Sequence, residues 1–238
     1  MTSKTAALSI LPFAWALSAC AHAAGTQPHE MSVAEHEQAA IQEDTQAAQH
    51  AAQVDPSAKE TQERCTPGKG RVCWTVTSNP TAGHQDQAAQ HSELAAQHRA
   101  ASTALADAET RACVGLSEED RDTSPFAHRD DISRVAQLKE EKVVGKSRAT
   151  SETGATIVFR ATPGLTAEWL QRIVDCHLAR NAAVGHDVPE MAYCPLVPRG
   201  AEANVHSTGN GFAVDVRAKD AAAAAEIWRR AQLLTTSR

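Results

Sequence analysis

The sequence predicts an α+β protein in which an Ala- and His-rich helical stalk is followed by a C-terminal ββαββα domain. Two observations predict it. Small and apolar residues recur every seven positions from Met31 to Val54, and an internal repeat occupies residues 154–178 and 211–234. The repeat predicts a four-stranded antiparallel sheet with two helices on one face, because amphipathic helices need a surface to bury against.

The N-terminus has the composition of a secretory signal. Lys4 precedes an apolar run that is too short to span a membrane, and the run ends in Leu17-Ser18-Ala19-Cys20. These residues resemble the lipobox of bacterial lipoprotein precursors. The resemblance implies that residues 1–19 are removed and that Cys20 is acylated, which would anchor the chain in a membrane. The alternative is an ordinary secretory signal cleaved near Ala-His-Ala, with Cys20 lost.

Both alternatives place the chain outside the cytoplasm. In the lipoprotein alternative, the resemblance to Gram-negative lipoproteins implies a location in the outer membrane, with the protein facing the periplasm, because Ala21 and not Asp follows the cysteine. Removing residues 1–19 changes the formal net charge from −6 to −7, because Lys4 is their only charged residue. This acidity argues against nucleic acid as a partner.

The first half divides into four segments. Residues 20–58 are a low-complexity tether with helical tendency, and residues 80–115 are a long helix ending at Gly115. Between them, residues 59–79 read as a hairpin that places Cys65 and Cys73 on opposite arms, so we expect a disulfide there. Residues 116–131 form the linker to the domain.

The domain, residues 132–238, contains two strand–turn–helix copies, in which Gly154 and Arg160 match Gly211 and Arg217. Each copy has a candidate partner strand before it, at 132–142 and 203–207. Thr208-Gly209-Asn210-Gly211 joins the second pair and is a strong hairpin signal.

Histidines at positions 84, 91 and 98 follow the seven-residue register of the long helix, as do His29, His36 and His50 upstream. Seven residues rise about 10.5 Å along a helix, so one helix cannot chelate a metal with this spacing. Two antiparallel helices could, if His29 faces His98, His36 faces His91 and Glu43 faces His84. The alternative is that the imidazoles flank the alanine face and keep it soluble.

A second candidate metal site lies in the domain. Two cysteines and three histidines within about thirty residues could bind Zn or Cu, namely Cys176, His177, His186, Cys194 and His206. The alternatives are a Cys176–Cys194 disulfide, with Cys113 left unpaired, and His177 as a hydrogen-bonded core residue. His128 could form an acid–base pair with Asp130 or Asp131. The alternative is that this segment is only a capped turn.

The sequence contains no Gly-x-Ser-x-Gly, phosphate loop or dinucleotide-binding motif. We therefore expect a non-enzymatic, lipid-anchored envelope protein that binds or scaffolds an unknown envelope partner and has no cofactor. A Zn- or Cu-binding protein for metal handling is the alternative.

Overall fold

The computed structural model describes residues 31–68, 70–144 and 147–235. The signal segment, Cys20 and His29 lie outside these residues. In the described part of the chain, no helix has both the length and the apolar composition needed to cross a membrane.

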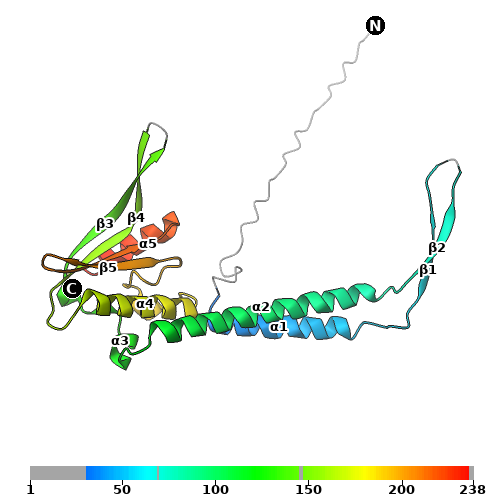
Figure 1. Ribbon diagram of the computed structural model, residues 1–238, viewed down its shortest axis with the longest axis horizontal. Helices are drawn as coiled ribbons and strands as arrows, with labels where there is room; N and C mark the ends of the chain where they lie inside the picture. The colour runs from blue at the N-terminus through cyan, green and yellow to red at the C-terminus, as the bar shows by residue number, and fades with distance from the viewer. Residues whose placement is uncertain (1–30, 69, 145–146, 236–238) are drawn as a thin grey trace, which may run out of the picture.

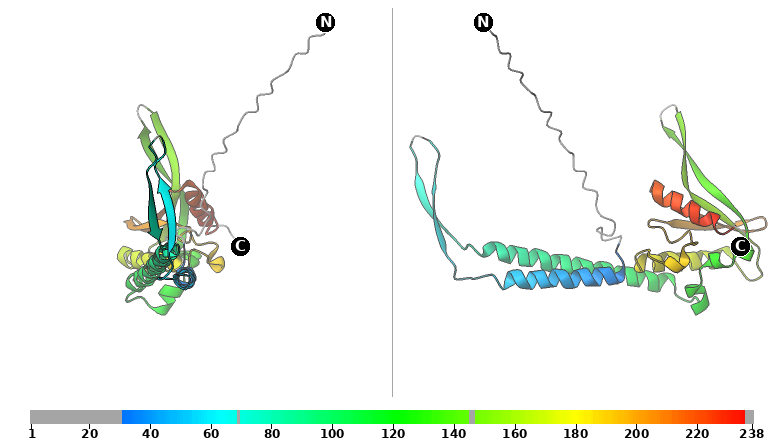
Figure 2. Two further views of the ribbon diagram at one scale, coloured as in Figure 1. Left: turned by 90° about the vertical axis from the view of Figure 1, so that its right-hand side faces the viewer. Right: turned by 180° about the vertical axis from the view of Figure 1, so that it is seen from behind.

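Two antiparallel helices form the stalk and lie side by side in Figures 1 and 2. Helix α1 (Val33–Ala51) begins in a capping box in which Ser32 and Glu35 satisfy each other's backbone N–H groups. Helix α2 (Ala82–Ala112) has 31 residues and is therefore about 46 Å long. Gly115, with a φ of 73°, follows its end, as predicted.

The hairpin of β1 (Glu60–Cys65) and β2 (Cys73–Ser78) connects the two helices at the far end of the stalk (Figure 1). The Cys65–Cys73 disulfide closes it, which confirms the predicted pairing. Three polar residues at the base of the hairpin tie its two arms together. Asn79 Nδ2 donates to Asp55 O at 2.8 Å, and Thr81 Oγ1 accepts from Asp55 N at 3.0 Å.

A short irregular segment leads into the domain through α3 (Glu118–Asp122), η2 (Pro125–Ala127) and η3 (Arg129–Asp131). Ser124 caps η2 by accepting from Phe126 N, and the Phe126 side chain is fully buried. This confirms the capped turn expected as the alternative to an acid–base pair.

The domain is a four-stranded antiparallel sheet in the order β3-β4-β6-β5, with helices packed on one face, as the sequence predicts. Its elements are β3 (Ile132–Val144), β4 (Ser147–Arg160), α4 (Ala167–Ala183), η4 (Pro189–Met191), β5 (Glu202–Thr208), β6 (Gly211–Arg217) and α5 (Ala221–Gln232). Strand β3 is two residues longer than predicted. Beyond residue 154 toward its tip, the β3–β4 hairpin projects past β6 as a two-stranded arm.

The two repeat copies meet at the centre of the sheet. Gly154 pairs with Arg217 and Arg160 pairs with Gly211, so β4 and β6 are related by an approximate twofold axis near Ile157 and Val214. The core lies between this strand pair and the two helices. Its residues alternate along the strands and follow the inner stripe of each helix: Ala155, Ile157, Phe159, Val214 and Val216 from the strands, and Leu170, Val174, Ile227 and Ala231 from the helices.

Candidate functional site

The five residues of the predicted metal site in the domain do not come together, so that prediction is wrong. Cys176 forms a disulfide with Cys113, and Cys194 is a buried free thiol. Both the expected Cys176–Cys194 bond and the expected unpaired Cys113 are therefore wrong. The cause is the long helix α2, whose end packs against α4 and brings in a cysteine 63 positions away.

The histidines of that set have separate surroundings. The His177 side chain is buried, and its Nε2–H donates to the carbonyls of Asp120 and Thr123 at 3.1 and 3.0 Å. This confirms the alternative of a hydrogen-bonded core residue. His186 donates from Nδ1 to Val197 O at 2.8 Å. Burial lowers the pKa of both imidazoles.

His206 is exposed on the open face of the sheet, where its Nδ1 lies 3.8 Å from Asp215 Oδ2. In the described residues, the only three potential ligands whose atoms all lie within 4.8 Å of one another are Glu63, Cys65 and Cys73. The two thiols of that group are joined in the disulfide, so they are not metal ligands.

The stalk histidines of the described residues face the helix interface, where His36 is buried and the others are half-buried. The positions at which the two helices meet form a seam. Small residues occupy one set of these positions, among them Ala40, Ala47 and Ala95. The imidazoles and Glu43 occupy the other set, and His36 is fully buried. The imidazoles therefore flank the alanine positions, as the alternative expected, and they face the partner helix.

Antiparallel packing of the two helices is confirmed, but its register differs from the expected one by one heptad. His36 faces His98, with Nδ1 atoms 3.0 Å apart, and Glu43 Oε2 accepts from His91 Nδ1 at 2.6 Å. His50 faces His84. Each register aligns alanines with alanines, so the repeat alone does not select between them.

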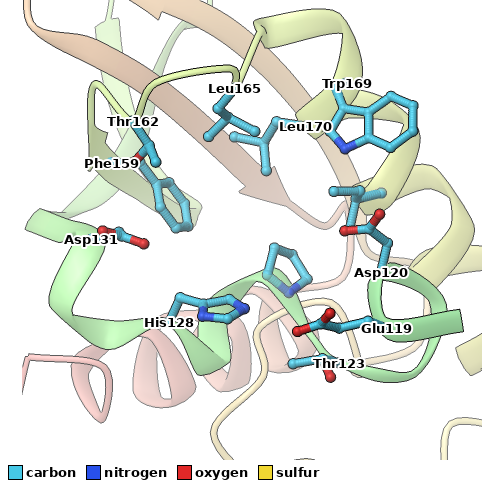
Figure 3. A pocket seen from close by; sticks show the side chains of 12 residues that line it. Glu119, Asp120, Thr123, His128, Asp131, Phe159, Thr162, Leu165, Trp169 and Leu170 are labelled. Carbon is cyan, nitrogen blue, oxygen red and sulfur yellow. The ribbon is translucent and has the colours of Figure 1, made fainter. Parts of the chain in front are cut away.

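The domain has a pocket of about 230 Å³ between α3, η2, the end of β4 and the start of α4 (Figure 3). Apolar side chains make its interior: Pro125, Phe159, Leu165, Trp169, Leu170 and Ile173. Three carboxylates, those of Glu119, Asp120 and Asp131, stand at its rim, and no Lys or Arg lines it. We call it the acid-rimmed pocket.

The side chains that line the pocket differ in their contacts with the rest of the protein. Asp120 Oδ2 accepts from Ser117 Oγ at 2.8 Å. One face of Trp169 is covered by the Arg172 guanidinium, 5.0 Å from the ring centroid. His128 and Asp131 both line the wall, but in the described residues their side chains form no hydrogen bond with each other or with Asp130. The acid–base pair considered from sequence is not assembled.

The pocket was missed from sequence because its walls come from segments up to about fifty residues apart. The only local signals were the acidic run at 117–122 and the apolar stripe at the start of α4. At the opposite end of the molecule, the β1–β2 hairpin exposes Val72 and Trp74. The chain matches no protein-family model, no curated protein and no solved structure.

Proposed function

We propose that this chain is a lipid-anchored protein of the bacterial cell envelope that binds a basic segment of another envelope protein and catalyses no reaction. The acid-rimmed pocket carries the proposal, since it combines an apolar interior with three carboxylates and no cationic lining group. Acylated Cys20 would provide the membrane contact, and the outer membrane facing the periplasm is the proposed location.

The size of the pocket favours one side chain as its occupant. Sites for drug-sized ligands and cofactors measure about 300–1,000 Å³, and this pocket is smaller, at about 230 Å³. An apolar side chain would fill the interior, while Lys or Arg residues next to it would meet Glu119 and Asp131. Neither carboxylate forms an ion pair within the described part of the chain, whereas the neighbouring Asp122 is paired with Arg180.

We propose that the stalk carries the β1–β2 hairpin, and not the domain, away from the anchor. Helix α1 begins beside the domain, where Ser32 adjoins Gly185, and runs away from it (Figure 1). A tether ending at Ser32 would therefore hold the domain close to the anchor, and the stalk would carry the β1–β2 hairpin outward. The two ends can then serve as separate binding surfaces, which supports a scaffolding role.

The pocket is tested with two peptides, one with a single Leu flanked by Arg residues and the other with Glu in place of Arg. Trp169 reports binding through its indole resonance in an NMR titration. We expect the basic peptide to shift this resonance, and the Glu119→Gln/Asp131→Asn double variant to bind it at least about tenfold more weakly at low salt.

Glu152→Gln/Glu190→Gln is the matched control, because it removes two exposed charges that lie outside the pocket. Equal binding by both double variants, or resonance shifts confined to other parts of the protein, would overturn the proposed pocket. The anchor has its own test. Mass spectrometry of the mature N-terminus should find acyl chains on Cys20, and an unmodified chain beginning after it would exclude the anchor.

A further inference from the structure

We propose that His50 and His84 bind a divalent transition-metal ion between α1 and α2, with His91 as a third ligand. This site differs from the five-residue set in the domain and is independent of the acid-rimmed pocket. Its two principal ligands come from different helices, so the ion would join the two arms of the stalk near its hairpin end (Figure 1).

The distance between the two facing nitrogens matches a chelating pair. The Nδ1 atoms of His50 and His84 are 3.3 Å apart. Two imidazole nitrogens bound to one tetrahedral Zn²⁺ at 2.0–2.1 Å are also about 3.3 Å apart. The two side chains therefore already lie at the nitrogen–nitrogen separation that an ion requires, and a turn of the rings about their side-chain torsions would direct both lone pairs at the ion without any change in the helix register.

The ion-free pair is held by a single proton. Both Nδ1 atoms point at each other, so one must carry the hydrogen and the other must accept it. When a metal ion binds, this hydrogen moves to Nε2 of the same ring, so that both Nδ1 lone pairs are offered to the ion.

His91 lies where a third ligand is needed. Its ring stacks on that of His50, with centroids 5.3 Å apart and planes 4° from parallel. Glu43 accepts from its Nδ1, which leaves the lone pair of the other nitrogen, Nε2, available to a metal. A carboxylate behind a histidine ligand is a common second partner of metal-bound imidazoles, and here it also supplies negative charge.

The His91 ring has to turn to complete the site. Because ligand atoms of these residues do not all lie within 4.8 Å of one another, the third bond requires rotation about the side-chain torsions of His91. All three imidazoles are half-buried and so retain access to solvent, whereas His36 in the similar His36–His98 pair is fully buried. We therefore place the ion at the hairpin end of the stalk and not at the domain end.

The donor set defines the class of metal. Two or three neutral imidazoles with a carboxylate nearby suit Zn²⁺ and Cu²⁺, and they disfavour Mg²⁺ and Ca²⁺, which prefer oxygen ligands. Metal binding would change the stability of the stalk. The seam is made of alanines, which bury little apolar surface, so a bond across it would stabilise the packed stalk by an amount that grows with the logarithm of the metal concentration.

The test uses the full mature chain without an affinity tag. Zn²⁺ is titrated by calorimetry, and Cu²⁺ is followed by electron paramagnetic resonance, in which nitrogen ligands produce a characteristic splitting. We expect one ion per chain, nitrogen splitting from at least two imidazoles, and a rise in Tm with added Zn²⁺. His84→Asn should weaken binding at least about tenfold and remove the rise in Tm.

Three further variants make the result specific. His91→Gln should weaken binding less than His84→Asn and reduce the number of coupled nitrogens. His98→Asn, in the neighbouring pair, and His206→Asn, on the open face of the sheet, should bind one ion as the wild type does. Helical circular dichroism checks that each variant is folded.

Absence of stoichiometric binding by the wild type would overturn the proposal. So would a loss of binding in His98→Asn or His206→Asn with none in His84→Asn, since the ion would then lie elsewhere. Mg²⁺ is the control and should produce neither heat nor a shift in Tm. This result would distinguish binding at the histidines from general screening of the chain's negative charge.

Discussion

Gly154 and Gly211 occupy equivalent places in the two repeat copies. Both have φ near 150°, and a Cβ at either position would lie 2.0 Å from a backbone oxygen, that of Val216 or of Phe159. The two oxygens also belong to matching positions of the repeat. The central strand pair therefore approaches closely at both ends, and glycine is required at each.

Gly211→Ala should destabilise the domain. The new methyl group would force β6 away from β4, and L residues rarely adopt this φ, so we expect a loss of at least about 2 kcal/mol in the free energy of unfolding. Urea denaturation measures the loss. Gly209→Ala, in the same hairpin, is the control, because a Cβ there meets nothing within 4 Å and its φ is not positive. Equal effects of the two substitutions would contradict the close approach.

The Cys113–Cys176 disulfide fixes the end of the stalk to the domain, and its removal should cost more than removal of the hairpin disulfide. The bonds close loops with sequence separations of 63 and 8 residues. Chain entropy then predicts losses of about 4 and about 2.5 kcal/mol respectively for the double Cys→Ser variants. Denaturation of each variant by urea, compared with that of the wild type, checks the order of the two losses.

Thiol labelling gives an independent check on this connectivity. Cys194 is fully buried, and burial raises the pKa of its thiol, so it should react with iodoacetamide only after unfolding. Peptide mapping should then find label on Cys194 and none on Cys113 or Cys176. Label on Cys113 in unreduced protein would instead support the pairing that sequence proximity suggested.

The domain could be predicted from sequence because its information is local. Each copy carries its own strand pattern, turn residues and amphipathic helix, and Thr208–Gly211 marks the second hairpin. The register in which the two stalk helices pack could not be predicted, because a seven-residue repeat matches itself after every heptad. The observed register places Asp55 against Asn79 and Thr81 at the base of the hairpin, and these contacts lie outside the repeat. The pocket and the Cys113–Cys176 bond depend on packing between distant segments, which periodicity does not encode.

Acidification should weaken the domain through His177. Burial lowers the pKa of this imidazole below its ordinary value of 6.5, although its two hydrogen bonds to carbonyls oppose the shift. Below about pH 6.5 the unfolded chain therefore binds the proton more readily than the folded chain does. The stability contributed by neutral His177 is complete above that pH and is lost as the pH falls toward the folded-state pKa.

His177→Gln should reduce this pH dependence. The amide can donate to the same carbonyls but does not titrate, so the variant should lose about 1 kcal/mol at pH 7.5 and depend less on pH between 7 and 5. Urea denaturation at both pH values measures the difference. His186, whose pKa burial also lowers, should leave some dependence in the variant. An unchanged slope would show that His177 is not the titrating group.

The stalk seam should not tolerate a larger side chain at Ala95. This residue is fully buried where α2 meets α1, one turn from His98. Ala95→Leu would push the helices apart and separate the His36–His98 pair, and overpacking of this kind costs about 1–3 kcal/mol. Spin labels on the exposed positions Glu37 and Gln97 should report a longer distance between the helices. Ala96→Leu, on the exposed side of the same turn, should leave that distance unchanged, because position 96 does not meet α1. Alanine and leucine have similar helix propensities, so the two variants differ mainly in whether the new side chain is buried. Equal distances in both leucine variants would mean that the stalk can accommodate bulk in its seam and that the imidazole pairs do not depend on close alanine packing.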